Sequence, residues 1–493
     1  MILIALLLSS LIPGLVIFLL PEEWHRTRSV LNLAGALTKV ALVAVLVYEF
    51  SQGRTQEVRA GFLPGLPFVL RVDELAILFV GLSALLWLLT TVYAIGYLED
   101  APFRSRFFGF FSLCVTATVG VALAGNLITL LVFYEALTLA TYPLVVHRGT
   151  PAALAAGRVY LIYTLGGGTV LLGAIVWLET LAGPVEFTRG GALGAVAEGD
   201  RAALVAIFGL LVAGFGVKAA LVPLHGWLAR AMVAPAPVSA LLHAVAVVKA
   251  GAFGVLRVVE DVYGLPLAGS LDVLTPLAVA AAVTIIYGSL RAMAQDDLKR
   301  RLAFSTVSQV SYILLGAALL APLAAAGALA HLVHQGIMKI TLFFAAGVLA
   351  ETLGIHRVSE MAGVGRRAPW TMAAFTVAAL GMIGLPPTAG FISKWYIGRG
   401  AVDAGQDWAL VVLALSGVLN AVYFLPIIHA AWFRKQSGPW PDERPRGRAE
   451  APLALLVPTL ITGALTIAAG LLAGAALSPS SIAVELAPGV DGP

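Results

Sequence analysis

Long apolar runs recur along the whole chain, separated by short polar connections. A helix that crosses the hydrocarbon core of a bilayer needs about 20 apolar residues. Within lipid, only helices and closed barrels pair all of their backbone polar groups. The pattern therefore predicts an all-α polytopic membrane protein with about 14 transmembrane helices, near residues 2–20, 29–49, 72–94, 107–124, 126–146, 155–178, 203–222, 238–257, 273–291, 303–320, 324–350, 372–397, 407–432 and 452–476.

The composition agrees with this class and excludes several others. Of the 493 residues, 60% are hydrophobic and 12% are charged, which is about half the charged fraction of a soluble protein. The single cysteine, Cys114, allows neither a disulfide nor a cysteine-based metal site within the chain. Membrane topology explains the net charge of +4 better than binding to nucleic acid does. We also expect no cofactor and no metal. Residues 2–20 lack a basic n-region and a cleavage site, so we expect a transmembrane helix there and not a signal peptide.

Basic residues are distributed unevenly among the connections. Those after odd-numbered helices, for example Arg104, Arg106 and residues 299–301, hold more than twice as many lysines and arginines as those after even-numbered helices. Because basic loops stay in the cytoplasm, both termini are predicted to lie outside it. The connections 51–71 and 179–202 are expected to form short caps at one surface.

Lysines are concentrated within the predicted spans. The chain has seven lysines, and five of them fall in apolar segments: Lys39, Lys218, Lys249, Lys339 and Lys394. A lysine at the bilayer centre costs about 2.5–3.5 kcal/mol on insertion scales. Arginine cannot lose its proton in a protein, whereas a buried lysine can. The choice of lysine therefore indicates proton exchange, although the isolated Lys39 could instead extend its ammonium group to the membrane surface.

Two of the predicted spans are interrupted by prolines close to these lysines. In the stretch 214–257, three prolines lie between Lys218 and Lys249. In the stretch 380–397, two adjacent prolines precede Lys394. Proline removes a backbone donor and breaks a helix. Interrupted spans in two halves of a transporter are typical of inverted repeats with ion sites at the breaks.

Other titratable residues lie within the spans as well. Glu135 is the only carboxylate well inside a predicted span, and it is either a structural partner for a lysine or a proton site. Asp73 and Glu74 begin the third helix and are expected to have a mainly structural role.

Histidines add to this set of groups. His331, His334 and Lys339 share one helix face within about 100°, and histidine can relay protons in either direction. No carboxylate or cysteine lies at ligand spacing, which argues against a metal site. His225 and His243 flank the first break, and each is either a relay member or a hydrogen-bonded core group.

Several motifs carry a family resemblance over about residues 72–430. They are FYEALTLATYPL, GFGVKAALVPLHGWLARA, APAPVSALLHAVAVVKAG, QDDLKRRLAFSTVSQVSY and GLPPTAGFISKW. In these motifs the chain resembles the antiporter-like, proton-translocating subunits shared by respiratory complex I, membrane-bound hydrogenases and Mrp-type sodium/proton antiporters. It departs from the family pattern at Tyr134, where tryptophan is common, and at residues 229–230, where Pro-Asp is common.

The resemblance implies a fold and a set of roles. It implies two inverted five-helix repeats, each with a broken helix, and hence segments at 1–100, 101–260, 261–432 and 433–493. It implies that Glu135 and Lys218 form a control pair and that Lys249 is the central relay. His334 and Lys339 would continue the relay, and Lys394 would be the exit-side group. The segment HQGIMKITLFF looks most like the D-type subunit of Mrp antiporters.

Three functions are weighed on these grounds. The first is a proton-translocating subunit of a multisubunit Mrp-type Na⁺/proton antiporter in a prokaryotic plasma membrane, with other hydrophobic subunits as partners. The second is a pumping subunit of a complex I-like NADH dehydrogenase or a membrane-bound hydrogenase, whose redox chemistry would lie in its partners. The third is a stand-alone solute permease, against which the series of lysines and histidines argues. The sequence leaves the exchanged cation open.

Overall fold

The computed structural model describes residues 1–63, 66–99, 101–194, 200–436, 438–444, 449–476 and 478–486. Parts of the predicted caps at 51–71 and 179–202, and the end of the segment 433–493, therefore lie outside the described residues. Within the described residues, 11 helices are long and apolar enough to cross a membrane. The chain is thus an integral membrane protein of the polytopic all-α class, as predicted.

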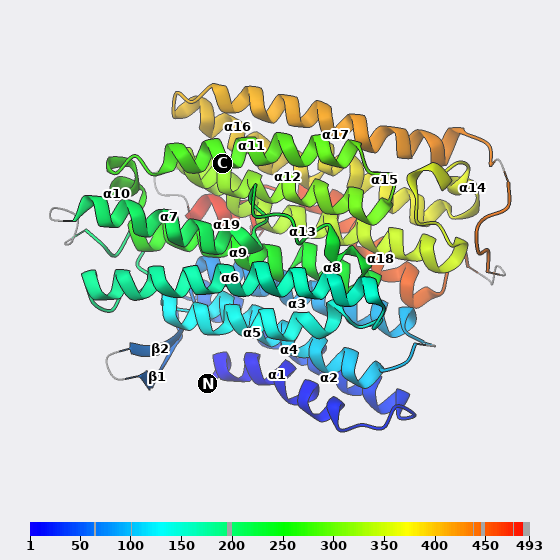
Figure 1. The fold of residues 1–493 in the computed structure, drawn as a ribbon, viewed down its shortest axis with the longest axis horizontal. Helices are drawn as coiled ribbons and strands as arrows, with labels where there is room; N and C mark the ends of the chain where they lie inside the picture. The colour runs from blue at the N-terminus through cyan, green and yellow to red at the C-terminus, as the bar shows by residue number, and fades with distance from the viewer. Residues whose placement is uncertain are drawn as a thin grey trace. The chain divides into compact units, whose positions relative to one another are not determined.

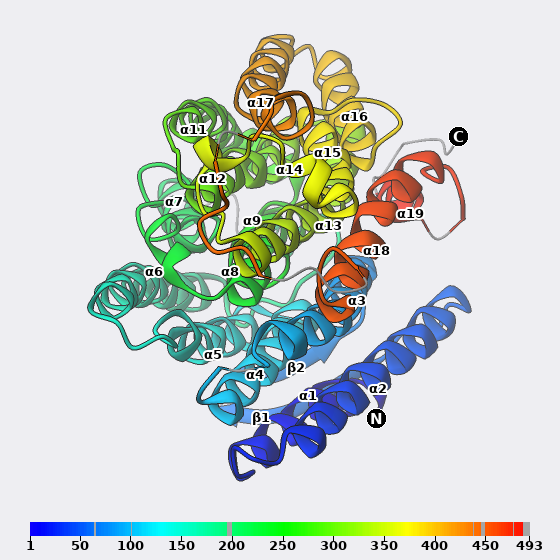
Figure 2. The same ribbon diagram turned by 90° about the vertical axis from the view of Figure 1, so that its right-hand side faces the viewer.

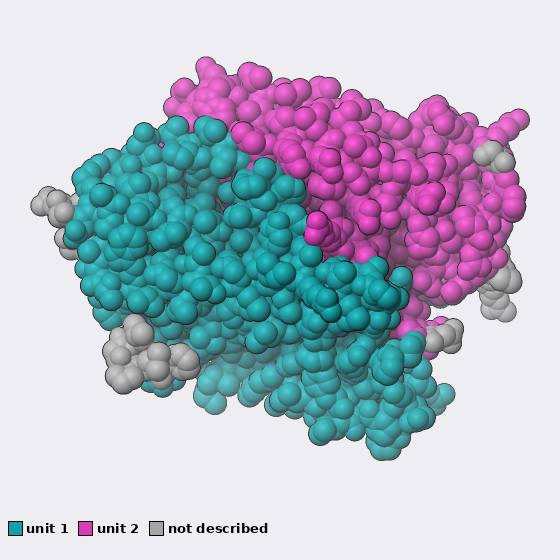
Figure 3. Space-filling view, viewed as in Figure 1, with its two compact units in different colours: residues 1–88, 102–227, 245–280 teal, residues 89–101, 228–244, 281–493 magenta. Residues whose placement is uncertain are grey.

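The chain divides into two compact units (Figure 3). Unit 1 comprises residues 1–88, 102–227 and 245–280, and unit 2 comprises residues 89–101, 228–244 and 281–493. The segments implied by the family resemblance follow the proposed repeats, and they remain a prediction.

Unit 1 is a bundle in which helices that are close in the sequence pack side by side (Figures 1 and 2). Asn126 and Thr150 begin two of these helices by accepting a hydrogen bond from the first turn, which satisfies backbone donors that have no partner inside the helix. The helices are α1 (Ile2–Phe18), α2 (His25–Ser51), most of α3 (Glu74–Tyr97), α4 (Arg104–Leu123), α5 (Leu127–Val145), α6 (Pro151–Ala182), α7 (Arg201–Lys218), α9 (Val247–Arg257), the π-helix η2 (Val258–Tyr263) and α10 (Leu265–Ser270).

A β-hairpin caps one end of unit 1 (Figure 1). Strands β1 (Glu57–Leu63) and β2 (Leu66–Arg71) pair antiparallel, and Val69 of β2 accepts a backbone hydrogen bond from Gly125 in the α4–α5 connection. The residues near 51–71 thus form the expected cap, but they do so as strands, which an all-α prediction did not include.

Unit 2 is built around α13, which is buried along nearly its whole length. This helix packs against α8, α12, α15, α16 and α18. The elements of unit 2 are η1 (Arg230–Val233), α8 (Ala236–Ala244), most of α11 (Leu274–Met293), α12 (Leu298–Ala318), α13 (Pro322–Leu353), η3 (Val358–Glu360), α14 (Val364–Arg367), α15 (Pro369–Ile383), α16 (Ala389–Asp403), α17 (Trp408–Phe433), α18 (Leu453–Leu471) and α19 (Pro479–Leu486).

The two proline breaks lie where the sequence placed them. Helix α7 ends at Lys218, four residues earlier than expected, and Ala220 after it has a φ of 58°. Helices α15 and α16 are separated at Gly384, whose φ of 101° is accessible to glycine at little cost. A third interruption was not predicted: the span 238–257 is divided into α8 and α9. No proline or glycine lies at that point in the sequence, so no local signal marks it.

Candidate functional site

Lys218 is the last residue of α7, and its side chain is fully buried. Its Nζ donates a hydrogen bond to the Tyr134 carbonyl of α5 and lies 3.3 Å from the centre of the Tyr134 ring. The Tyr134 hydroxyl donates to the Gly214 carbonyl over 3.3 Å, and Trp227 Nε1 donates to the Val217 carbonyl over 2.8 Å. Side chains of α5 and of the segment after α7 therefore bind carbonyls in the last turns of α7.

Glu135 lies next to Tyr134 on α5 and is half-buried. In the described structure its carboxylate is not within ion-pair distance of Lys218, and no hydrogen-bond partner reaches its Oε1 atom. Gly168 of α6 lies directly against this carboxylate, so that a side chain at 168 would overlap it. The predicted pair therefore shares one neighbourhood and interacts through space.

Lys249 is the third residue of α9, and its side chain is fully buried. No hydrogen-bond partner for its Nζ exists among the described residues. Helix α9 comes close to the end of α7 because Gly251 lies against the backbone of Lys218 and Ala219. His225 is half-buried in the segment that follows α7. Unit 1 therefore brings two of the predicted lysines and one histidine to the two sides of one break.

In unit 2, Lys339 and His331 both contact α12. The Nζ of Lys339 donates hydrogen bonds to Ser305 Oγ and, over 3.3 Å, to the Leu302 carbonyl. The Nδ1 of His331 lies 2.8 Å from Ser393 Oγ of α16, and its ring centre lies 5.3 Å from that of Tyr312. His331, His334 and Lys339 are all fully buried on α13.

Lys394 follows the second break, on α16. Its Nζ donates to the carbonyls of Met382 and Ile383, at 2.7 and 3.1 Å, and lies 4.9 Å from the centre of the Tyr312 ring. These carbonyls belong to the end of α15. A cation is favourable there, because the C-terminus of a helix carries partial negative charge.

His243 is the other predicted histidine of unit 2. It is fully buried on α8, with its ring centre 4.7 Å from that of Phe343. Neither ring nitrogen has a hydrogen-bond partner among the described residues. In the described residues, no group of three or more His, Cys, Asp or Glu residues could hold a metal ion.

Two residues were read incorrectly or missed. Lys39 does not extend to the surface: its Nζ is buried and donates to Ser10 Oγ over 2.7 Å. The ion pairs of Arg257 were missed: it closes α9 and lies 2.7 Å from both Asp73 and Asp261. The RVVED spacing, with Asp261 four residues after Arg257, was the available signal for one of these pairs, and no local signal marks the pair with Asp73. Asp73 also accepts a hydrogen bond from the Ala76 amide, in agreement with its predicted structural role.

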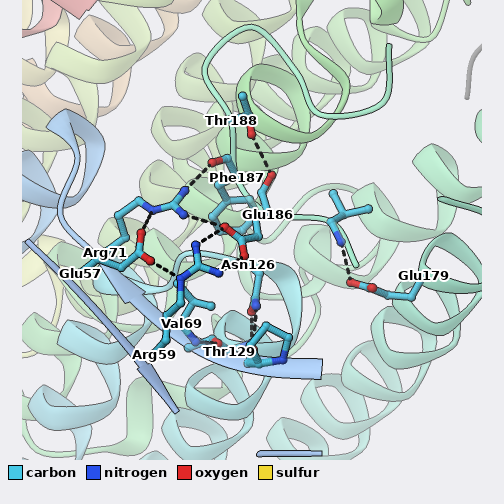
Figure 4. Close-up of polar contacts among 12 residues, drawn as sticks. Glu57, Arg59, Val69, Arg71, Asn126, Thr129, Glu179, Glu186, Phe187 and Thr188 are labelled. Carbon is cyan, nitrogen blue, oxygen red and sulfur yellow. Dashed lines mark hydrogen bonds and ion pairs between the residues drawn. The ribbon is translucent and has the colours of Figure 1, made fainter. Parts of the chain in front are cut away.

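A cluster of exposed charges joins the hairpin to the connection after α6 (Figure 4). Glu57 and Glu186 bind Arg59 and Arg71 in a closed network, with Arg71 at 2.7 Å from both carboxylates. Partial burial opposes ionisation of Glu57, but hydrogen bonds from Arg71 and Arg59 hold its pKa below the usual value. The pKa of Glu186 is lowered in the same way. The cluster fastens this end of unit 1 and contains no residue of the predicted relay.

Comparison with known proteins identifies relatives over most of the chain. The family model described as NADH:quinone oxidoreductase/Mrp antiporter, TM matches residues 124–420. NADH-quinone oxidoreductase subunit N of Desulforudis audaxviator is 37% identical over 84% of this chain and 83% of that protein. Subunit L of Mycobacterium tuberculosis is 33% identical over 82% of this chain, which spans only 64% of that longer protein. In a solved structure of the Mrp complex from Dietzia sp., one chain has a TM-score of 0.85 and 26% identity, with 98% of this chain and 97% of that chain covered.

Proposed function

The chain belongs to the NADH:quinone oxidoreductase/Mrp antiporter family of membrane proteins, and from this premise we propose that it is a proton-translocating subunit of a multisubunit antiporter that exchanges a monovalent cation for protons. The family match extends from residue 124 to residue 420 and so contains all of the main candidate residues. The likeness to a chain of the Mrp complex over 98% of this chain supports an antiporter.

The observation that carries this proposal is the placement of a lysine at each of the two proline breaks. Lys218 ends the helix before one break, and Lys394 lies on the helix after the other. Each ammonium group binds backbone carbonyls inside an apolar bundle. Such a position is costly for a permanent charge and suits a group that gains and loses a proton.

We assign the remaining roles by unit. In unit 1, Glu135 controls the charge of Lys218, and Lys249 receives the proton. In unit 2, His334 and Lys339 carry it onward and Lys394 releases it; His331, His225 and His243 are secondary members. At low dielectric, a unit charge acts strongly on a neighbouring group, so protonation of Glu135 changes the proton affinity of Lys218. A membrane potential supplies about 2.3 kcal/mol per charge per 100 mV, which is enough to drive such steps.

The finer parts of the proposal concern cation, partners and location. We propose Na⁺ as the exchanged cation, other hydrophobic membrane subunits as partners, and the plasma membrane of a prokaryote, with both termini outside the cytoplasm. The second candidate is a pumping subunit of a redox complex. It is favoured by the 37% identity to a NADH-quinone oxidoreductase subunit.

Co-purification separates the two candidates. The chain would be isolated in mild detergent from its native membrane, and its companions identified by mass spectrometry. Small hydrophobic subunits with a larger paralogue, without iron or flavin, support the antiporter. Iron–sulfur or nickel-containing subunits would refute it in favour of the redox-driven pump.

A further inference from the structure

A buried lysine lies in unit 1 away from both helix breaks. Lys39 occupies the middle of α2, and its side chain is fully buried. Its Nζ donates to Ser10 Oγ of α1 over 2.7 Å, and Ser10 Oγ lies 2.8 Å from Thr116 Oγ1 of α4. The ring centre of Trp87, on α3, is 5.1 Å from the ammonium nitrogen. Four helices therefore enclose this one cation.

A row of buried polar side chains continues from this group along the same helices, which lie side by side in Figure 2. Thr116 Oγ1 also donates to the Ser112 carbonyl over 3.1 Å, one turn earlier on α4, and Ser112 Oγ donates to Asn32 Oδ1 over 3.3 Å. Asn32 Nδ2 in turn donates to the Arg28 carbonyl over 3.1 Å.

This row ends at an exposed acid. Arg28 is 1% exposed and donates to Ser105 Oγ over 2.8 Å. Its guanidinium lies 3.9 Å from Glu22, whose side chain is 44% exposed. The polar row therefore runs from the surface at Glu22 to the centre of α2 and stops at Lys39.

No acid compensates the charge of Lys39. Helix α1 carries no titratable side chain, and the part of α3 in unit 1 carries only Glu74, in its first turn. Helix α4 carries Arg104 and Arg106 in its first turn, and Cys114 further along, which is hydrogen-bonded to α5. Among the described residues, no carboxylate lies within ion-pair distance of Lys39. An ammonium group has three donors, and within the described structure only one hydrogen bond, to Ser10, is formed.

The hydroxyl pair beside Lys39 suits both protonation states. A charged Lys39 donates to Ser10, which then donates to Thr116. A neutral amine has a lone pair and can accept a hydrogen bond from Ser10, while the Thr116 hydroxyl turns from the Ser112 carbonyl to donate to Ser10. Either oxygen of the Ser10–Thr116 pair can be the donor, so the change of state needs only rotation of hydroxyl groups.

We propose that Lys39, Ser10 and Thr116 form a further proton-binding site, separate from the two lysine sites at the proline breaks. A lysine whose only role is to join α1 to α2 does not explain the row of buried polar groups between Glu22 and Lys39. The site has no acid partner in the described structure, so its charge is not set by a neighbouring carboxylate as that of Lys218 is by Glu135.

Nitrogen-15 NMR of lysine side chains tests the site directly, because the full chain has seven lysines. The chain would be labelled with ¹⁵Nζ-lysine in lipid, and the Lys39 signal identified by its loss in Lys39→Gln. If that variant fails to fold, Ser10→Ala identifies the signal by its shift while keeping the lysine. We expect this signal to pass from the ammonium to the amine position within the pH range of transport. A signal that stays at one position across that range would overturn the proposal.

Transport measurements give a second readout. We expect Lys39→Arg, which keeps the charge but cannot release it, to move the half-maximal pH of transport by about one unit, a tenfold change in proton affinity. Lys435→Gln removes an exposed lysine and should leave the profile unchanged. A wild-type profile in Lys39→Arg would contradict the proposal. The NMR result does not depend on which cation is exchanged. The proposed proton site and the proposed function can therefore fail independently of each other.

Discussion

The two helix breaks hold their lysines in different ways. Lys218 comes before its break and binds a carbonyl of another helix, α5, beside the carboxylate of Glu135. Lys394 comes after its break and binds the end of α15, the helix that the break itself interrupts. In the described structure no carboxylate is within ion-pair distance of Lys394.

The two sites therefore differ in whether a neighbouring residue can change the charge near the lysine. The charge near Lys218 changes whenever Glu135 gains or loses a proton, so the first site can be switched by a neighbouring group. The backbone carbonyls near Lys394 have fixed dipoles, so the second site cannot be switched in this way. A lysine at a proline break thus has a changeable charge beside it in unit 1 and only fixed backbone dipoles beside it in unit 2.

The largest expected effect comes from removing the switch. Glu135→Gln keeps the size of the side chain but holds it neutral. A change of one pKa unit, about 1.4 kcal/mol, already alters proton affinity tenfold, so we expect transport in everted vesicles to fall by at least about tenfold with normal assembly. Glu49→Gln, which removes a carboxylate paired with Arg54 at the surface, is the matched control. Wild-type transport in Glu135→Gln would show that Glu135 does not control Lys218, and the proposed difference between the two sites would then be wrong.

The second effect compares stability after loss of each lysine. Lys394→Met leaves the Ile383 carbonyl at a helix end without its donor, which costs about 1–2 kcal/mol. Lys218→Met frees the Tyr134 carbonyl, which lies inside α5 and also accepts from Thr138. We therefore expect thermal unfolding to show a loss only for Lys394→Met, although both variants lose transport. Equal destabilisation would show that both lysines support their breaks.

These contrasts define what the sequence could and could not predict. A lysine or a proline in an apolar run is anomalous by itself, so Lys218, Lys394 and both proline breaks were found directly. Their partners were not: the Tyr134 and Met382 carbonyls are backbone atoms, and every residue has one. Ser305 beside Lys339 lies 34 positions away in the chain and becomes a neighbour only after α12 and α13 pack.

The burial of Lys39 was missed for a related reason. A single lysine in an apolar helix can either reach the surface or find a partner, and only the fold decides between them. The partner, Ser10, is a small residue in an ordinary apolar run. Hydroxyl groups of this kind are common in membrane helices, so the sequence offers no reason to select one.

A smaller effect tests whether close packing against Gly168 holds the Glu135 carboxylate in place. A methyl group at Gly168 would overlap the Glu135 carboxylate, so Gly168→Ala should move that group and reduce transport several-fold. Gly173→Ala lies on the same helix with no atom within 4 Å of the added methyl, and it should transport normally. If both variants behave alike, the position of the carboxylate is not set by α6.

The smallest effect concerns charges that are exposed rather than buried. The pKa of Glu57 is held below its usual value by Arg71 and Arg59. Its ion pair therefore contributes stability above the unfolded carboxyl pKa of about 4.3, and this contribution is lost as the pH falls through the lower folded pKa. Exposed pairs contribute little, so Glu57→Gln should cost about 0.5 kcal/mol at pH 7 in low salt and progressively less as the pH falls below that unfolded pKa, as measured by thermal unfolding. Transport should be unchanged, because the hairpin holds no relay residue. A transport defect in this variant would mean that charges at the end of unit 1 act on the buried lysines from outside, and the contrast between switched and fixed sites would then have to include this surface.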